Sequence, residues 1–340
     1  MNTMTDNASL SLSEHLTKLI PGTGRRELRE SVLPTLLRSI IDVSKCLRSS
    51  LDIRQAGSIN TSGDSQLNVD LATNEAIHSA IRTCPSIVAA SSEEDEGESP
   101  VKHIGEQVSR PVTSEQYAVA FDPLDGSSII PANWAVGTII GIWDGKTGLN
   151  QDPRSRQIAA ILGVLGPRTT ALVALRLPES GTPACFEVGL DGESQSVQVL
   201  RSDVRFLDAT RVKTRYFAPA NLRAAAQNLE YASLVSHFIR NQYTLRYSGG
   251  LVPDVVHALI KGHGIYISPV TSESKAKLRR LYELAPIALL VECAGGKAVD
   301  PSSGVNILDT KIATVEDKAG LVCGATEEVD MVMTRLKTAA

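Results

Sequence analysis

The sequence predicts a mixed α/β (α+β) fold. Apolar residues recur at helical spacing over residues 10–51, and short β-rich segments separated by glycine-rich turns follow between residues 117 and 200. After residue 213, predicted strands are interspersed with predicted helices. The chain has 340 residues, of which 42% are hydrophobic, so it is long enough for two domains or for one large α/β body.

Composition narrows the function classes. The formal net charge of −4 argues against a nucleic-acid partner, and the absence of an 18-residue apolar run argues against a membrane span. Residues 1–13 are polar and lack the basic and apolar regions of a signal peptide, so we expect a flexible tail over residues 1–20. The five cysteines are scattered, which favours reduced thiols and a cytoplasmic location.

The first elements are predicted to be packing helices over residues 10–19 and 28–51, with Pro34 suited to the first turn of the second helix. A turn-rich segment, residues 57–70, contains Asp64 and Asp70 and leads into a helix over residues 71–82. An aspartate at such a position is often a helix N-cap, and one after glycine is often a turn residue. Both aspartates therefore have a structural interpretation beside a functional one.

Acidic residues follow two consecutive predicted strands. Glu93 and Glu94 come just after the strand at residues 87–90, and the strand at residues 117–121 runs into Asp122-Pro123-Leu124-Asp125-Gly126-Ser127-Ser128. Carboxylates are ligands that Mg²⁺ prefers, and a turn of small residues can present backbone N–H groups to an anion. The segment therefore predicts a divalent metal acting on a phosphate ester.

The later elements are predicted in chain order. Strands over residues 135–143, 158–165, 169–177 and 184–189 indicate a second, mostly antiparallel sheet, and Gly137 and Gly141 in the first strand indicate close backbone approach or a bulge. Strands and helices follow at residues 213–219, 221–228, 232–240, 243–247, 252–260 and 264–268. A helix over residues 275–294 is expected to kink at Pro286 and to end at Gly295-Gly296.

Five blocks of the chain resemble, in the same order, those of the sugar-bisphosphatase family that contains the fructose-1,6- and sedoheptulose-1,7-bisphosphatases. The blocks are Gly63-Asp64 with Asp70, Ser92-Glu93-Glu94, Asp122 to Ser128, Arg246 to Gly250, and Lys277 to Glu283. The resemblance implies an α-β-α-β-α layered sandwich of the sugar and inositol phosphatase type. It also implies a metal-binding half over residues 21–200 and a substrate-binding half over residues 201–340.

The resemblance further implies roles for individual residues. It makes Mg²⁺, or alternatively Mn²⁺, the cofactor, with ligands Glu93, Asp122, the Leu124 carbonyl, Asp125 and Glu283. The residues that orient or deprotonate the attacking water would be Asp64, Asp70 and Glu94. Clustered carboxylates repel one another, so we expect raised pKa values in the metal-free site. The alternative for Glu283 is an ordinary surface ion pair.

The phosphate-binding residues are implied in the same way. The scissile phosphate would be held by Gly126, Ser127 and Ser128, and the second phosphate by Asn221, Arg246, Tyr247 and Lys277. In the fructose enzymes the counterpart of Arg246 enters the neighbouring subunit's site, which implies a homodimer or homotetramer. Tyr247 in the core and Arg246 as a plain surface charge are the alternatives.

The substrate implied is a ketose bisphosphate. Residues 136–143, 217–224 and 243–255 resemble the sedoheptulose enzymes, and Ser268 stands where fructose enzymes have a tyrosine that helps to hold the far phosphate. We therefore predict hydrolysis of the 1-phosphate of sedoheptulose 1,7-bisphosphate. Hydrolysis of fructose 1,6-bisphosphate, or of both, is the first alternative, and a catalytically inactive sugar-phosphate sensor is the second.

Overall fold

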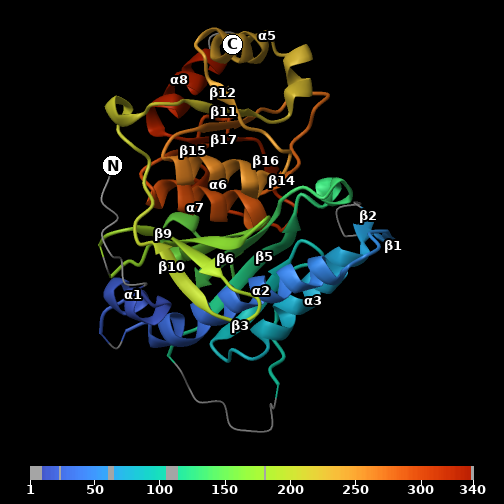
Figure 1. The fold of residues 1–340 in the computed structure, drawn as a ribbon, viewed down its shortest axis with the longest axis vertical. Coiled ribbons are helices and arrows are strands. Elements are labelled where there is room, and N and C mark those ends of the chain that lie inside the picture. Colours follow the sequence, from blue (N-terminus) through green and yellow to red (C-terminus); the bar gives the residue numbers. More distant parts are fainter. Residues whose placement is uncertain (1–9, 23, 60–64, 105–113, 180, 338–340) are drawn as a thin grey trace.

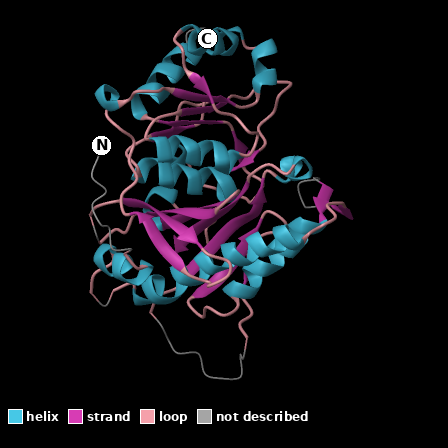
Figure 2. Ribbon diagram, viewed as in Figure 1, coloured by secondary structure: helices cyan, strands magenta, loops and turns pink. Residues whose placement is uncertain are grey.

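Five layers of secondary structure are stacked along the long axis of the molecule (Figure 1). The computed structural model describes residues 10–22, 24–59, 65–104, 114–179 and 181–337. From one end to the other, the layers are helices α5 (Leu229–Arg240) and α8 (Thr326–Lys337), a five-stranded sheet, helices α6 (Leu251–Lys261) and α7 (Ala285–Cys293), an eight-stranded sheet, and the N-terminal helices (Figure 2). The predicted α-β-α-β-α sandwich is confirmed.

The larger sheet has the strand order β10-β9-β8-β7-β6-β5-β3-β4. All neighbours are antiparallel except β3 and β5, which run parallel. The prediction of a separate second sheet is wrong, because β6 pairs with β5 along most of its length and so continues the same sheet. Its strands are β3 (Ile87–Ser92), β4 (Ser99–Pro100), β5 (Tyr117–Asp125), β6 (Val136–Asp144), β7 (Gln157–Leu165), β8 (Thr169–Leu175), β9 (Ala184–Leu190) and β10 (Val197–Arg201).

Successive side chains along the strands of this sheet point to opposite faces and pack into two separate hydrophobic cores. In β6, Ile139 packs with the middle helices and Ile140 packs with the N-terminal helices, as expected for successive residues of a strand. Both side chains are fully buried. The N-terminal helical elements are α1 (Leu12–Leu19), the π-turn η1 (Leu28–Val32), α2 (Leu33–Ser49) and α3 (Asn68–Ile81); Pro34 lies in the first turn of α2, as predicted.

Glycines let the middle helices approach the larger sheet. A Cβ atom on Gly137 would lie 2.3 Å from the Cβ of Val252 in α6, and one on Gly141 would lie 3.0 Å from the Cγ of Pro286 in α7. These distances confirm close backbone approach as the reason for glycine in this strand. The helix carrying Pro286 therefore packs against the strand that pairs with β5.

The smaller sheet has the strand order β12-β11-β13-β17-β15 and lies between α6 and α7 on one side and α5 and α8 on the other (Figure 1). Its strands are β11 (Tyr216–Pro219), β12 (Thr244–Leu245), β13 (Ile265–Ser268), β15 (Lys297–Val299) and β17 (Leu321–Gly324). The helices on it are α5 (Leu229–Arg240), α6 (Leu251–Lys261), α7 (Ala285–Cys293) and α8 (Thr326–Lys337). The remaining elements are short: β1 (Gln55–Ile59), β2 (Ser65–Leu67), β14 (Leu278–Arg279), β16 (Lys318–Ala319), α4 (Pro153–Arg156), and the turns η2 (Ser127–Ala132), η3 (Ala209–Arg211), η4 (Leu222–Ala226), η5 (Arg280–Leu284) and η6 (Ile307–Asp309).

The predicted helix over residues 275–294 begins later than expected. Residues 275–277 are irregular, β14 pairs with β16, and the helical segment starts only with η5, a π-turn that leads into α7. The pairing of β14 with β16 joins Leu278 to Ala319 and Arg279 to Lys318, and helical periodicity does not reveal such distant pairs. Pro286 is the second residue of α7, which directly follows the π-helical segment η5, so it lies where the helix changes from π to α geometry. Gly295 follows the helix with φ of +83°, as predicted for a C-cap.

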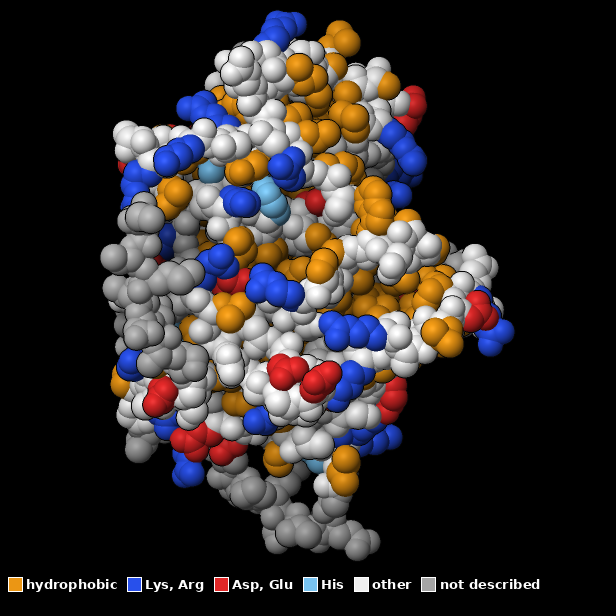
Figure 3. Space-filling model, viewed as in Figure 1, with side chains coloured by type: hydrophobic (Ala, Val, Ile, Leu, Met, Phe, Trp, Pro, Cys, Tyr) orange, Lys and Arg blue, Asp and Glu red, His pale blue; other side chains and the backbone are white. Residues whose placement is uncertain are grey.

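The N-terminal helix α1 packs on the larger sheet. Leu16 is fully buried, and the His15 ring meets Phe186 of β9 edge-on at 4.6 Å between ring centroids. None of the described helices is long and apolar enough to cross a bilayer. On the face drawn in Figure 3, Lys and Arg side chains are scattered among acidic and hydrophobic ones and form no single basic patch.

Candidate active site

Three buried carboxylates from distant parts of the chain form an acid cluster, consisting of Asp122, Asp125 and Glu283. One carboxylate oxygen of each lies within 4.8 Å of the others, and the three residues are 5%, 7% and 7% exposed. Asp122 and Asp125 lie at the end of β5, and Glu283 lies in η5. The structure thus brings together three of the predicted metal ligands.

A bulge at the end of β5 sets the direction of the two aspartates. Asp122 is paired with Ile139 and Asp125 with Gly137, so three steps along β5 match two steps along β6. Pro123 lies within the bulge, where a missing N–H is tolerated, and its carbonyl accepts a hydrogen bond from Thr138 Oγ1 at 2.9 Å. The Leu124 N–H donates to Asp122 Oδ1 at 2.9 Å, while the ligand role of the Leu124 carbonyl stays a prediction.

Glu93 reaches the same region from the neighbouring parallel strand. Its N–H donates to the Phe121 carbonyl at 3.0 Å, which continues the pairing of β3 with β5 beyond Ser92. The expectation that Glu93 lies beside the strand end where Asp122 emerges is therefore confirmed. The Glu93 carboxylate forms an ion pair with Arg279, and the Arg279 N–H donates to Glu283 Oε2 at 2.5 Å.

Asp125 also holds the start of a helix. Its two carboxylate oxygens accept hydrogen bonds from the N–H groups of Leu251, at 3.3 Å, and Val252, at 2.7 Å, in the first turn of α6. Backbone N–H groups at a helix N-terminus have no partner within the helix, so a carboxylate there is stabilising. Asp125 consequently links the acid cluster to the Ser248-Gly249-Gly250 turn that precedes α6.

The pKa values of the acid cluster are raised, as the sequence predicts for clustered carboxylates. Burial is the largest cause, and the charge of Glu93 adds to it; the pKa values of Asp122 and Glu283 lie well above their usual range. Burial raises the pKa of Asp125 to about 7, although the two α6 N–H groups act in the opposite direction. Negative charge at this position is therefore incompletely compensated by the described protein groups.

The donor set fits a hard divalent cation. Three buried carboxylate oxygens within 4.8 Å of one another match the oxygen coordination that Mg²⁺ and Mn²⁺ prefer. A cation would also stabilise the ionised forms that burial disfavours. Glu93 lies beside this cluster, with Arg279 as its present partner.

Two of the residues predicted to act on the attacking water, Asp70 and Glu94, lie near Glu93. Asp70 Oδ2 accepts from the Leu67 N–H at 2.7 Å, so its interpretation as a helix-capping residue also holds, while Asp70 Oδ1 is buried without a partner among the described residues. Burial raises the pKa of Asp70 to about 7, and the charges of Glu94 and Glu93 add to the rise. Glu94 Oε2 accepts from Gln66 Nε2 at 2.5 Å. Asp64 lies outside the described residues.

A cavity of about 560 Å³ adjoins the acid cluster and contains several of the predicted phosphate-binding residues. Gly249 and Leu278 line it, and they neighbour the segments that contact Asp125 and Glu283. Of the predicted substrate-binding residues, it is lined by Ser128, Asn221, Tyr247 and Lys277. We call it the phosphate cavity. Gly126, with φ of +86°, and Ser127 form the turn between Asp125 and Ser128.

Two predicted substrate-binding residues do not present their polar side-chain groups to the phosphate cavity of their own chain. Arg246 does not line the phosphate cavity; its guanidinium lies 5.7 Å from the centroid of the Tyr216 ring and donates to the Leu245 carbonyl at 2.8 Å. Asn221 lines the cavity, but its amide is used within the protein. Its Nδ2 donates to the Pro269 carbonyl and its Oδ1 accepts from Ser274 Oγ, both at 2.6 Å.

Four residues of the site are not among the sequence predictions. Arg279 pairs with Glu93, Gln66 donates to Glu94, and Arg223 and Lys275 line the phosphate cavity. Arg223 and Arg279 both occur inside blocks that resemble the family. In the sequence, each is a basic residue close to a predicted site residue. Basic residues are also typical of exposed surface positions, so this pattern does not distinguish the two cases.

Comparison with known proteins covers both halves of the chain. Residues 21–187 match the family model for the N-terminal domain of fructose-1,6-bisphosphatase, and residues 210–337 match the model for its C-terminal domain. A solved Toxoplasma gondii structure, provisionally assigned as a sedoheptulose-1,7 bisphosphatase, superposes with a TM-score of 0.83 at 28% identity, over 97% of this chain and 99% of that one.

Some of the proteins that are similar in sequence are named sedoheptulose-1,7-bisphosphatases, and others are named fructose-1,6-bisphosphatases. The chloroplastic sedoheptulose-1,7-bisphosphatase of Triticum aestivum is 34% identical over 94% of this chain and 75% of its own length. That of Spinacia oleracea is 35% identical, and this chain spans 65% of its length. The class 1 fructose-1,6-bisphosphatase of Syntrophotalea carbinolica is 32% identical over 92% of this chain and 93% of its own. The chain therefore belongs to the fructose-1,6-bisphosphatase family of sugar-bisphosphate phosphatases.

Proposed function

We propose that this protein hydrolyses the 1-phosphate of sedoheptulose 1,7-bisphosphate with Mg²⁺ as cofactor, Mn²⁺ being the alternative. One observation carries the proposal: an acid cluster that needs a cation adjoins a cavity that suits an anion. Among the described residues that line the phosphate cavity, three are cations, Arg223, Lys275 and Lys277, and none is a carboxylate. A sugar bisphosphate would place its reacting phosphate at the acid cluster and its second phosphate in the phosphate cavity.

The residues that would hold the cation are Asp122, Asp125 and Glu283, with Glu93 and the Leu124 carbonyl as further ligands. Bound there, Mg²⁺ would neutralise charge on the phosphoryl oxygens and lower the pKa of a water molecule. The turn from Gly126 to Ser128 would hold the scissile phosphate through N–H and hydroxyl donors. Binding at both ends of the substrate orients the ester bond for in-line attack.

Asp70 is the group best suited to accept a proton from the attacking water. A general base works best when its pKa lies near the working pH, and burial raises the pKa of Asp70 to about 7. Its Oδ1 is buried and unpartnered among described residues, whereas the Glu94 carboxylate already accepts from Gln66. We therefore assign Asp70 the proton transfer, and Glu94, with Asp64, the orientation of the water.

The choice of the seven-carbon substrate is supported by Ser268. This residue lines the phosphate cavity and stands where the fructose enzymes have a tyrosine. A serine leaves more space for a longer substrate. Fructose 1,6-bisphosphate is the second candidate, favoured by the similarity to the Syntrophotalea carbinolica enzyme. A sensor without activity is disfavoured, because the acid cluster has the donor set that catalysis needs.

Two further parts of the proposal concern the assembly and the location. Arg246 lies outside the phosphate cavity of its own chain, which supports a role in the site of a neighbouring subunit of a homodimer or homotetramer. The five cysteines are free thiols, four of them buried, which supports a reducing compartment such as the cytoplasm.

The test is phosphate release from three substrates with and without Mg²⁺: sedoheptulose 1,7-bisphosphate, fructose 1,6-bisphosphate and inositol monophosphate. We expect Mg²⁺-dependent release, fastest from the first, and a fall in kcat of roughly 10³-fold for Asp122→Asn. The control is Asp203→Asn, because Asp203 is exposed and pairs only with Arg205 on the described surface. No release from any substrate would favour the sensor, and faster turnover of the fructose substrate would overturn the seven-carbon choice.

A further inference from the structure

One cation of the phosphate cavity lies apart from the residues that the resemblance identifies. Arg223 is part of η4, is exposed, and forms no ion pair with a described carboxylate. Two other arginines near the cavity do form ion pairs, Arg279 with Glu93 and Arg280 with Asp300 at 2.7 Å. The charge of Arg223 is therefore available to a ligand, while those two arginines are engaged by the protein.

The structure of the loop before η4 explains why Arg223, and not Asn221, is placed to bind. Asn221 has a left-handed backbone, with φ of +49°, and both polar atoms of its side chain bind the protein at 2.6 Å. These contacts tie the start of η4 to Pro269 and Ser274, which also line the cavity. Asn221 is thereby a positioning residue that fixes the turn on which Arg223 stands two residues later.

Arg223 and Tyr247 lie on the same part of the cavity wall. Burial raises the pKa of the Tyr247 hydroxyl, Asp254 adds to the rise, and the guanidinium of Arg223 acts in the opposite direction. Arg223 therefore lies close enough to Tyr247 for their charges to interact. A tyrosine hydroxyl and a guanidinium together can donate several hydrogen bonds to one phosphate group.

We propose that Arg223 is a specificity-determining residue that binds the phosphate distant from the scissile one, and that it favours a seven-carbon ketose bisphosphate over a six-carbon one. The inference rests on the proposed function. Ser268 and Arg223 line the same cavity, and the residue after Ser268, Pro269, is hydrogen-bonded to Asn221 at the start of η4, so a longer substrate that passes the small Ser268 side chain would extend toward η4. The planar guanidinium has a fixed donor fork that matches phosphate oxygens, which a lysine ammonium lacks.

The experiment compares KM for three substrates in the full-length wild type and in Arg223→Leu. The substrates are sedoheptulose 1,7-bisphosphate, fructose 1,6-bisphosphate and fructose 1-phosphate, which has no second phosphate. We expect KM to rise roughly 10- to 100-fold for the seven-carbon bisphosphate, from the loss of charge-assisted hydrogen bonds. The rise should be smaller for the six-carbon bisphosphate and smallest for the monophosphate.

Two further variants make the result specific. Arg223→Lys keeps the charge and loses the fork, so it should recover only part of the affinity for the seven-carbon substrate. Arg211→Leu removes an exposed arginine from the comparable turn η3, outside the phosphate cavity, and should leave all three KM values at the wild-type level. The thermal unfolding midpoint of each variant verifies that it is folded.

The outcomes separate this inference from the proposed function. If the wild type hydrolyses the bisphosphates and Arg223→Leu keeps the wild-type KM values, or raises all three equally, Arg223 does not read the second phosphate. If the wild type releases phosphate from neither bisphosphate, the proposed function fails and the inference fails with it.

Discussion

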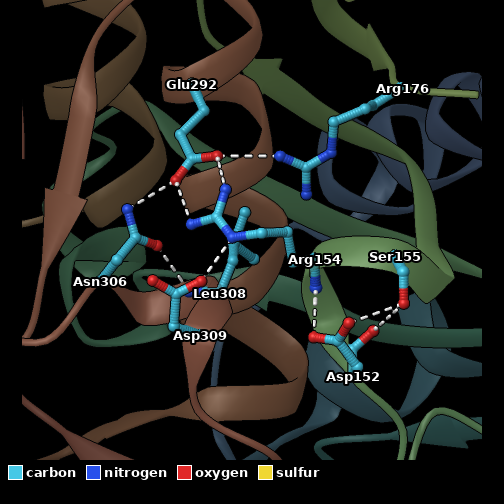
Figure 4. Close-up of polar contacts among 8 residues, drawn as sticks. All are labelled: Asp152, Arg154, Ser155, Arg176, Glu292, Asn306, Leu308 and Asp309. Carbon is cyan, nitrogen blue, oxygen red and sulfur yellow. Dashed lines mark hydrogen bonds and ion pairs between the residues drawn. The ribbon is translucent and has the colours of Figure 1, made fainter. Parts of the chain in front are cut away.

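Two carboxylates on one helical segment have opposite surroundings. Glu292 lies at the end of α7, and Glu283 lies nine residues earlier, in η5. Figure 4 shows the group that we call the Glu292 latch: Arg154, Arg176, Glu292, Asn306 and Asp309. Glu292 accepts from Arg176 at 2.8 Å, from Asn306 at 2.7 Å and from Arg154 at 3.2 and 3.4 Å, whereas Glu283 faces the carboxylates of Asp122, Asp125 and Glu93.

Positive and negative charges balance in the Glu292 latch, whereas negative charges are in excess around the acid cluster. The Glu292 latch has two carboxylates and two guanidinium groups, whereas Glu93 and the acid cluster together have four carboxylates with Arg279 as their paired cation. A buried charge needs a partner to offset its desolvation. The latch obtains its partners within the fold and joins the N-terminal to the C-terminal family region, so its role is structural. In the proposed function, the acid cluster binds its charge partner, a divalent cation, from solution.

The largest expected effect that tests this contrast is on the pH dependence of stability. Folding raises the pKa of Asp70 and Asp125 to about 7, mainly through burial, from roughly 3.9 in the unfolded chain. At a pH between the unfolded-state and folded-state pKa values, the folded state binds more protons than the unfolded state. The free energy of unfolding therefore falls as the pH rises through this range. We expect the free energy of unfolding of the chelator-treated protein to drop by roughly 3 kcal/mol or more from pH 5 to pH 8, measured by urea denaturation.

Two controls accompany this measurement. Mg²⁺ should restore more stability at pH 8 than at pH 5, because it binds the deprotonated carboxylates. Asp70→Asn should stabilise the metal-free protein at pH 8. Asp95→Asn should destabilise it, because the hydrogen bonds to His78 and Asn74 outweigh burial and hold the pKa of Asp95 low. A profile that is flat or rises with pH would show that the acid cluster is already neutralised.

The features of the site that depend on residues close together in the sequence could be predicted from the sequence. The strand ending at Asp122, the turn of small residues after Asp125 and the position of Glu93 all follow from strand patterns, and the role of Glu283 came from the resemblance. The pairing of β5 with β6, and of β14 with β16, depends on long-range hydrogen bonds that periodicity does not encode. Charge partners cannot be predicted from the local sequence either. Nothing in it distinguishes Arg223, which lines the cavity and pairs with no carboxylate of the described residues, from Arg280, which pairs with Asp300.

A second prediction concerns removal of either carboxylate from the η5–α7 segment. Glu292→Gln should lower the free energy of unfolding by about 3 kcal/mol, because it leaves the partly buried charge of Arg176 without its carboxylate partner among the described residues. Glu283→Gln should instead raise the unfolding midpoint of the metal-free protein, because it removes one of the repelling charges. Mg²⁺ binding, measured by calorimetry, should be lost in Glu283→Gln and retained in Glu292→Gln. Equal destabilisation by both changes would mean that the two carboxylates have the same structural role.

The smallest expected effect lies within the Glu292 latch itself. The Arg154 side chain is 43% exposed and that of Arg176 is 19% exposed, although both pair with Glu292. Ion pairs in contact with solvent contribute little, because water and salt screen them. Arg154→Ala should therefore lower the free energy of unfolding by less than about 1 kcal/mol, and the deficit should shrink when urea denaturation is repeated in roughly 1 M salt. Arg176→Ala, the matched change at the more buried arginine, should cost more and depend less on salt; the reverse order would make Arg154 the main partner of Glu292.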